Sequence, residues 1–351
     1  MRYLFLVIFF PIVLNAKGRN ELNRFVLLRD KILLEQILKQ NRPLSYLDID
    51  FHGTSGLKSM IGDLKNSTNN SKLDAFNKQS SIIQMLDKLV NTEKYIDLDL
   101  WASIPFGKYS YGNLVFYPSI FASMDFAANF SVSNAGDPAN PILQTYLRLD
   151  QKLGFWAKIL LSETTYLHGK FYQLARRDNY SLYNAAAIIN EGSGNILGTN
   201  NLNQVDTFAM LDLLYSKKFI DQKINLEIQE LQLINNVYNG KEFYYPNFPF
   251  WHMSYEFYYT LKGGGTLTLL GGVHNRQRYS LLNGTYFGLK IKTLESPFQF
   301  LGIVDSNFIT LNPKIILPYF SLNYTIKLPI YNPQQYYWVG VIHGINLSLL
   351  Y

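Results

Sequence analysis

The last fifteen residues, Tyr337 to Tyr351, alternate between large apolar side chains and smaller or more polar ones. Counted back from the end in steps of two, one set is almost wholly apolar: Tyr351, Leu349, Leu347, Ile345, His343, Val341, Val339 and Tyr337. The interleaved set includes Gly, Ser and Asn: Leu350, Ser348, Asn346, Gly344, Ile342, Gly340 and Trp338. Because successive side chains of a strand point to opposite faces, the pattern predicts a strand with one apolar face.

An apolar strand face that ends on an aromatic residue is typical of a lipid-facing barrel strand. This strand resembles the closing strand of bacterial outer-membrane β-barrel proteins, in which a terminal aromatic residue and apolar residues at every second position form an assembly signal. The resemblance implies that Tyr351, Leu349 and Leu347 form that signal and that the barrel-assembly machinery is a partner. Taken alone, the C-terminus also fits a half-buried edge strand of a soluble sheet.

The N-terminus predicts export. Arg2 precedes an apolar run from Tyr3 to Leu14, and the chain becomes polar after Ala16. Such a run is too short to span a bilayer and is typical of a signal peptide, here residues 1–16. The chain has no Cys, which excludes an anchor through a lipidated Cys, a disulfide and a thiolate ligand.

After residue 16 the chain lacks the run of about 18 apolar residues that a membrane helix needs. An exported chain with 15% aromatic and 17% charged residues can then span a membrane only as a closed barrel, which places it in the outer membrane. Lys and Arg are scattered, so the net charge of +6 is only weak evidence for nucleic acid, which we do not expect as a partner. The charge suits contact with lipopolysaccharide or anionic solutes.

Residues 17–92 differ from the rest. Apolar residues at helical spacing predict one helix within 20–40 and a second within 73–90, separated by a polar linker at 66–72. We interpret 17–92 as a helical region, either a small periplasmic domain or a plug in the lumen.

From residue 93 to 351 the period changes to two, which predicts an all-β fold, a transmembrane antiparallel up-and-down β-barrel of about 12 strands, with a range of 10–14. The expected strands are 95–104, 114–132, 143–161, 165–177, 206–219, 223–234, 252–262, 266–279, 285–294, 299–311, 315–327 and 337–351.

The connections conflict with the usual arrangement of such barrels. With both termini in the periplasm, the two longest connections, Asp178–Val205 and Asn235–Trp251, fall on the periplasmic side. Bacterial barrels have short periplasmic turns and long external loops. Either the count misses one strand near each end, or the barrel acts from its periplasmic face.

Basic side chains fall on one face of the later strands. Charge is costly against lipid, so these residues are expected to face the lumen, opposite the acid Glu256: Lys262, His274, Arg276, Arg278, Lys290, Lys292 and Lys327. The pattern is compatible with an anion-preferring lumen and equally with a closed interior filled by salt bridges.

The sequence shows no catalytic or cofactor-binding pattern. His274 stands next to Asn275, but a Ser with an oriented base is missing, and the five His do not have metal-ligand spacing. Asp97 and Asp99 on one strand, and Asp48 and Asp50 in an expected loop, are interpreted as surface acids. We expect no enzyme activity, no metal and no cofactor, with an outer-membrane hydrolase left as a third alternative.

One connection is rich in aromatic residues, which suits a partner contact or an interfacial girdle: Tyr238, Tyr244, Tyr245, Phe248 and Trp251. Two functions therefore stay open. The first is a porin-like channel or transport protein for small solutes with a basic lumen. The second is a non-catalytic anchoring or assembly component that binds other envelope proteins through its N-terminal helices and long loops.

Overall fold

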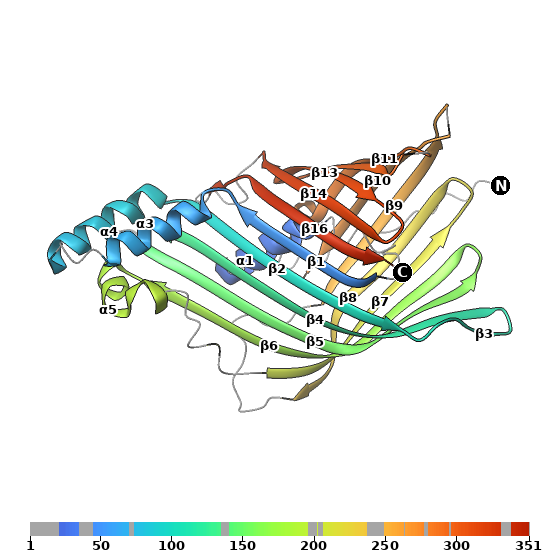
Figure 1. Ribbon diagram of the computed structural model, residues 1–351, viewed down its shortest axis with the longest axis horizontal. Helices are drawn as coiled ribbons and strands as arrows, with labels where there is room; N and C mark the ends of the chain where they lie inside the picture. The colour runs from blue at the N-terminus through green and yellow to red at the C-terminus, as the bar shows by residue number, and fades with distance from the viewer. Residues whose placement is uncertain are drawn as a thin grey trace.

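The described part of the chain forms a closed antiparallel β-barrel (Figure 1). The computed structural model describes residues 21–34, 45–69, 74–134, 140–195, 202, 206–236, 249–262, 264–276, 280–294, 296–330 and 338–350. Within these residues one sheet has sixteen strands, and fourteen of them form the ring. The ring closes where β1 pairs with β16 and β2 pairs with β4. The predicted all-β barrel is confirmed, with fourteen strands rather than about twelve.

The elements have the following bounds. The ring consists of β1 (Ser45–Thr54), β2 (Thr92–Pro105), β4 (Leu114–Ser133), β5 (Ile142–Ser162), β6 (Thr165–Tyr183), β7 (Asp206–Lys218), β8 (Gln222–Asn236), β9 (Phe250–Thr260), β10 (Thr266–Asn275), β11 (Thr285–Lys292), β12 (Phe298–Asp305), β13 (Phe308–Ile316), β14 (Phe320–Pro329) and β16 (Ile342–Leu350). Two short strands extend it, β3 (Tyr109–Tyr111) and β15 (Trp338–Val339). The helices are α1 (Glu21–Ile32), α3 (Leu57–Asn69), α4 (Ala75–Leu89), α5 (Ala185–Asn195) and α6 (Leu281–Gly284). No described helix is long and apolar enough to cross a membrane.

The first strand missing from the prediction is β1, which lies within the stretch interpreted as a helical region. Leu47, Ile49 and Phe51 alternate with Asp48 and Asp50, and the two aspartates are buried on the opposite face from the apolar set. The prediction that Asp48 and Asp50 lie in a loop is wrong. Asp is disfavoured in strands generally, but an inner barrel face accommodates it.

The second missing strand lies near the other end of the chain. The expected strand 299–311 is two strands, β12 and β13, joined by a tight turn at Ser306 and Asn307. The Asp305 carboxylate closes this turn by accepting hydrogen bonds from the backbone N–H groups of Asn307 at 2.7 Å and Phe308 at 3.0 Å. An Asp that hydrogen-bonds to the backbone after it is a turn signal. The count therefore missed one strand near each end.

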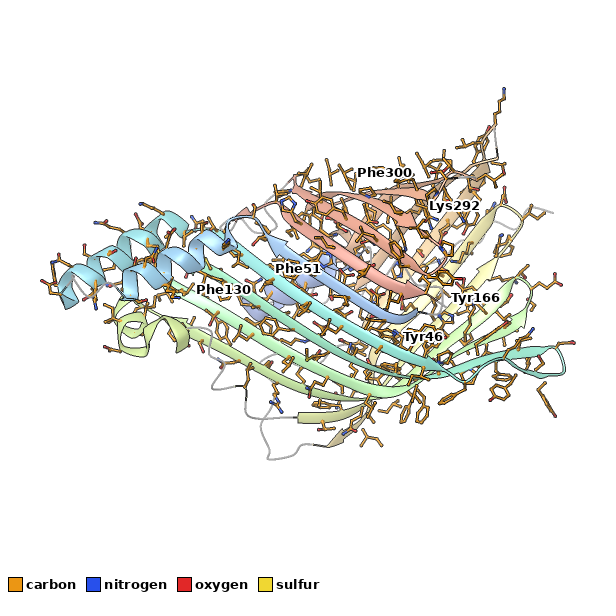
Figure 2. The ribbon with its side chains drawn as sticks, viewed as in Figure 1. Tyr46, Phe51, Phe130, Tyr166, Lys292 and Phe300 are labelled. Carbon is orange, nitrogen blue, oxygen red and sulfur yellow. The ribbon has the colours of Figure 1, made fainter. Side chains whose placement is uncertain are left out.

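The outer face of the barrel is apolar, as the alternation of the last strand predicts. On β16, Ile345 is 51% exposed whereas the neighbouring Asn346 is 1% exposed. Leu347 and Leu349 share the outer face with Ile345, and Tyr351 lies outside the described residues. Phe51 and Phe300 also lie exposed on the ring (Figure 2). These side chains stay exposed among the described residues and form the surface that lipid would cover.

The two additional strands correct the placement of the long connections. Ser45, the first residue of β1, pairs with Leu350, so β1 starts at the end of the barrel where the chain terminates. Following the strands in order, the connections β6–β7 and β8–β9 lie at the opposite end. The expectation that these two connections lie at the barrel end that holds the C-terminus is wrong. The additional strand β1 moves every connection up to β12 to the other end of the barrel. Long connections opposite the C-terminus are the usual arrangement of bacterial barrels.

Helices α3, α4 and α5 form a cap on the outside of the wall, at the end opposite the C-terminus (Figure 1). Apolar residues on these helices, among them Met60, Ile82 and Ile188, pack against Phe130 and Leu147 on β4 and β5. Phe130 and Leu147 alternate with lumen-facing residues and so belong to the outer face. The predicted helix within 73–90 is confirmed as α4, whereas α3 was not predicted and includes part of the expected linker.

Candidate functional site

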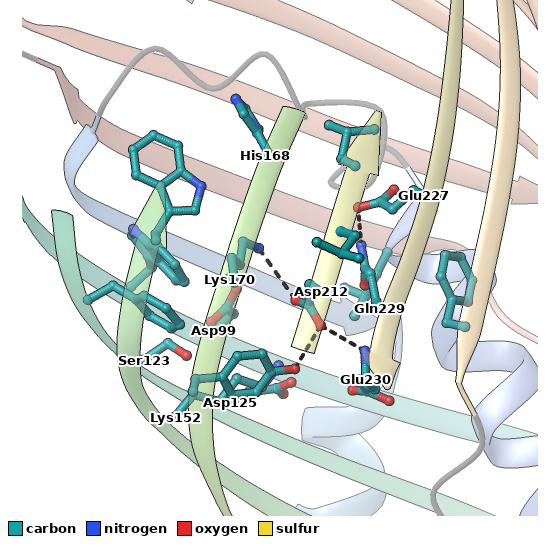
Figure 3. A pocket seen from close by; sticks show the side chains of 18 of the residues that line it. Asp99, Ser123, Asp125, Lys152, His168, Lys170, Asp212, Glu227, Gln229 and Glu230 are labelled. Carbon is teal, nitrogen blue, oxygen red and sulfur yellow. Dashed lines mark hydrogen bonds and ion pairs between the residues drawn. The ribbon is translucent and has the colours of Figure 1, made fainter. Parts of the chain in front are cut away.

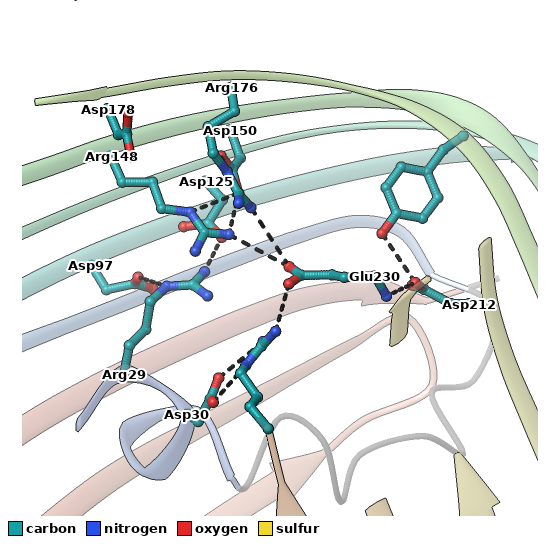
Figure 4. Close-up of polar contacts among 12 residues, drawn as sticks. Arg29, Asp30, Asp97, Asp125, Arg148, Asp150, Arg176, Asp178, Asp212 and Glu230 are labelled. Atoms are coloured by element: carbon teal, nitrogen blue, oxygen red, sulfur yellow. Dashed lines mark hydrogen bonds and ion pairs between the residues drawn. The ribbon is translucent and has the colours of Figure 1, made fainter. Parts of the chain in front are cut away.

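Helix α1 lies inside the barrel and reaches opposite walls (Figures 1 and 4). Arg29 contacts Asp97 on β2, and Asp30 contacts Arg276, just past the end of β10. In the order of the ring, β2 and β10 are seven strands apart in either direction. The end of a single short helix can touch both walls only if it lies in the lumen between them. The predicted first helix is thus present, and the structure places it in the barrel interior.

The first polar tether of α1 is Arg29. Its guanidinium forms an ion pair with Asp125 on β4 and lies 3.6 Å from Asp97, measured from Nε to Oδ2. Asp97 also accepts a hydrogen bond from the Tyr95 hydroxyl at 2.8 Å. Since Asp97 is buried and faces the lumen, its interpretation as a repelled surface acid is wrong. Arg29, which is distant in sequence, balances the charge of Asp97. The spacing of residues around Asp97 could not indicate this partner.

The second tether is a chain of charged groups that starts at Asp30. Arg276 donates to Asp30 from Nε at 2.7 Å and to Glu230 on β8 from Nη1 at 2.8 Å. Arg148 on β5 approaches the other carboxylate oxygen of Glu230 at 3.5 Å. Arg148 and Arg176 both bind Asp150, with Arg176 Nε and Nη2 each 2.7 Å from a carboxylate oxygen. This network joins α1 to strands on two sides of the ring (Figure 4).

Glu230 occupies an unusual backbone position at the centre of this network. Its φ of 56° lies in the left-handed region, which is rare for a residue with a long side chain. The pairing of β7 with β8 shifts register between Leu211 and Leu213, so the strand bulges there. The Glu230 N–H donates to the Asp212 carboxylate at 2.7 Å, which holds the bulge in place. Bulges redirect side chains, and this one directs a carboxylate to three arginines.

Apolar contacts also hold α1 in its position in the lumen, which we call its seat. Leu28 and Ile32 pack against Tyr95, Ala127 and Ile342 on three different strands. Lys31 donates to the Ser306 hydroxyl at 2.6 Å, and its carbonyl accepts from Lys327 at 3.2 Å. Burial lowers the pKa of Lys31 to about 8, although Asp305 opposes this effect. The helix is held by polar and apolar contacts together.

A cavity of about 200 Å³ lies beside α1, toward the end of the barrel where the C-terminus lies (Figure 3). It follows β2 from Asp99 to Trp101 and Ser103, beyond the level of Arg29. Its lining includes six carboxylate side chains and four from Lys or Arg: Asp30, Asp99, Asp125, Asp212, Glu227, Glu230, Arg29, Lys152, Lys170 and Arg276. The wall also has stacked rings, with Trp101 and Phe121 centroids 4.3 Å apart.

The residues predicted to face the lumen are distributed over several places. Arg276 and Lys327 contact α1, and Lys290 and Lys292 lie on β11 in register with residues of β10. His274 is buried near the rings of Phe250 and Tyr286. Lys262 is exposed just past β9, and Arg278 lies outside the described residues. The acid Glu256 binds Lys223 on β8 at 3.4 Å.

The aromatic contact candidates are mostly beyond the described residues. Tyr238, Tyr244, Tyr245 and Phe248 are not described, and Trp251 lies on β9 on the face opposite to His252. Among the residues that are described, no group of three or more His, Asp or Glu side chains is arranged to hold a metal ion. Arg29, Asp30 and Glu230 carry no local sequence signal that distinguishes them from surface charges, so their place in the lumen is not predictable from the sequence.

Comparisons with known proteins find weak structural similarities and no sequence match. No family model matches the chain, and no curated protein matches it. The transport unit of the autotransporter AIDA-I from Escherichia coli aligns over 95% of this chain and 100% of its own, with 9% identity and a TM-score of 0.42. CdiB from Escherichia coli aligns over 88% of this chain and 63% of its own, with 9% identity and a TM-score of 0.36. The β domain of the Bordetella autotransporter BrkA covers 87% and 98%, with 7% identity and a TM-score of 0.33.

These similarities are too low to add to what the strand pairing of the chain itself establishes. The closed ring, its apolar outer face and its polar interior are those of the bacterial outer-membrane β-barrel proteins that the C-terminal strand resembles.

Proposed function

We propose that this chain is an outer-membrane transport protein whose lumen is closed at rest by α1. The observation that carries the proposal is the attachment of α1 to opposite walls through Arg29 and Asp30. Desolvation offsets much of the attraction in a buried ion pair, so such pairs position a segment without adding much net stability. A helix held in this way can be released at lower free-energy cost than one buried only among apolar side chains.

The finer proposal is a porin-like passage for small solutes, without enzyme activity. The cavity beside α1 supports a pathway along the lumen on the side of the C-terminus. Its charges do not support a basic lumen, because carboxylates outnumber Lys and Arg in the lining. The solute path is therefore proposed without the anion preference.

Conductance of the full-length protein in planar bilayers tests this function. We expect the wild type to be mostly closed and Arg29→Ala/Asp30→Ala to open at least about ten times more often, since about 1.4 kcal/mol of lost tethering corresponds to a tenfold change. Lys88→Ala, on the exposed face of α4, is the control and should behave as the wild type. Equal and low open probability in all three proteins would refute closure by α1.

A second candidate is an anchoring or assembly component, which the cap favours. Phe76 on α4 is 79% exposed at the barrel end opposite the C-terminus, and Ile61 on α3 is exposed as well. An envelope protein or lipopolysaccharide would cover such side chains. This function replaces the first if a partner co-purifies with the wild type but not with Ile61→Ser/Phe76→Ser, and if Arg29→Ala/Asp30→Ala, hereafter the tether variant, does not conduct. The barrel-assembly machinery is proposed as a further partner.

A further inference from the structure

The inner wall carries a row of four aspartates on four consecutive strands of the ring. Asp50 on β1 pairs with Asp99 on β2, Asp99 with Asp125 on β4, and Asp125 with Asp150 on β5. Cross-strand partners place their side chains on the same face, so all four project into the lumen as one row across the wall. Like charges directly opposite one another are destabilising, and cations close to Asp125 and Asp150 offset the repulsion.

The cations come from two different sources. Asp150 is paired with Arg148 and Arg176, which belong to neighbouring strands of the wall. Asp125 is paired with Arg29, which belongs to the helix inside the lumen. If α1 leaves its seat, Asp150 retains its partners, whereas Asp125 loses Arg29.

Unused acceptors surround the place where Arg29 is bound. Among the described residues, one carboxylate oxygen each of Asp97 and Asp125 is buried without a hydrogen-bond partner. Asp97 and Asp125 are the two carboxylates that face the Arg29 guanidinium, so both free oxygens lie on groups already in contact with a cation. Buried polar groups are normally hydrogen-bonded. These acceptors indicate a site with capacity for a cation beyond what Arg29 supplies.

We infer that the open lumen selects cations at this row of aspartates, and that Arg29 occupies the position of such a cation while the barrel is closed. The inference rests on the proposed function. Without Arg29 and Asp30, the lining of the cavity has five carboxylates and three Lys or Arg side chains. Carboxylates that line a narrow pathway favour cations over anions. The chemical class is a small organic or inorganic cation, and guanidinium groups fit the position best because Arg29 already supplies one.

Binding of methylguanidinium to the full-length protein tests the site without requiring conductance. In Arg29→Ala, methylguanidinium should raise the thermal midpoint by about 2–4 °C relative to NaCl at equal ionic strength, as expected for a ligand well above its Kd. The wild type and Arg29→Lys keep a cation in the site and should not respond. Arg29→Ala/Asp125→Asn should also not respond. An equal shift in all four proteins, or no shift in Arg29→Ala, would overturn the inference.

Ion selectivity provides the second measurement. Arg29→Ala/Asp30→Ala in a KCl gradient should show a reversal potential that corresponds to K⁺ over Cl⁻ permeability of about threefold or more. Adding Asp99→Asn and Asp125→Asn should bring the ratio close to one, whereas adding Asp87→Asn on α4 should leave it unchanged. Anion selectivity would overturn the inference and leave closure by α1 intact. A silent tether variant would instead refute the proposed function, and methylguanidinium binding would then decide the inference.

Discussion

Arg276 donates two parallel hydrogen bonds to Asp30, from Nε to Oδ2 at 2.7 Å and from Nη2 to Oδ1 at 3.1 Å. The two residues are 246 positions apart in the sequence. Paired bonds between a guanidinium and a carboxylate fix orientation as well as distance. The same Arg276 side chain also binds Glu230, so one residue links the helix in the lumen to β8 as well.

Changes at Arg276 should therefore loosen α1 in a graded way. Arg276→Ala leaves Asp30 and Glu230 buried without this partner and should weaken the seat of α1 by about 3–5 kcal/mol. Arg276→Lys keeps the charge, loses the planar fork and should cost about 1 kcal/mol. The rate of trypsin cleavage within α1 measures the effect, with Lys88→Ala as the control. Equal cleavage rates in all variants would contradict the tether.

The charge and the backbone conformation of Glu230 allow a separate prediction. Glu230→Gln keeps the shape of the side chain but removes the charge that faces three arginines, and should lower the free energy of unfolding by about 3 kcal/mol. Glu230→Gly relieves the left-handed strain yet loses the carboxylate, so it should be destabilising too. Circular dichroism melts report the loss. Glu163→Gln, in an exposed turn, should leave the melt unchanged.

The apolar outer face predicts sensitivity to charge. Ile345→Arg places a cation against lipid and should reduce the free energy of unfolding by about 2–4 kcal/mol, depending on depth. Denaturant titration of the protein in phospholipid vesicles gives this value. Ile345→Leu should change it little. Tolerance of Arg at 345 would mean that this surface does not face lipid.

Packing of the cap predicts a local effect. Ile82 on α4 is fully buried between the cap and the wall, at 0% exposure. Ile82→Ala should lower the free energy that holds the cap on the wall by about 2–5 kcal/mol. Phe76→Ala is the matched control on the same helix, because Phe76 is exposed. Hydrogen exchange should accelerate in α3 and α4 of Ile82→Ala and stay unchanged in the barrel strands. Faster exchange throughout the barrel would show that the cap and the wall are one cooperative unit.

The sidedness of the barrel is open to direct labelling. The chain has no Cys, so single substitutions give an unambiguous signal. Lys65→Cys on α3 should react with an impermeant maleimide in intact cells. Lys108→Cys, in the turn between β2 and β3 at the opposite end, should react only after the outer membrane is opened. The reverse pattern would place the long connections in the periplasm.

The sequence by itself determined which face of a strand meets lipid. Ile345 and Asn346 differ in polarity, and the two-residue period of a strand converts that difference into outside and inside. The same signal was present in β1, where Leu47, Ile49 and Phe51 alternate with aspartates. The strand count failed there and at Ser306 because acids in a strand and a two-residue turn weaken the local pattern.

Only the tertiary structure decided where the helices pack and which charges meet. Amphipathic spacing gives α1 and α4 an apolar face each, but α1 lies in the lumen and α4 on the outer wall. Likewise, no local pattern pairs Arg29 with Asp125 or Asp30 with Arg276. Periodicity reports the two faces of an element, whereas closure of the ring brings distant elements together. The partners of a buried charge therefore become defined only when the barrel closes.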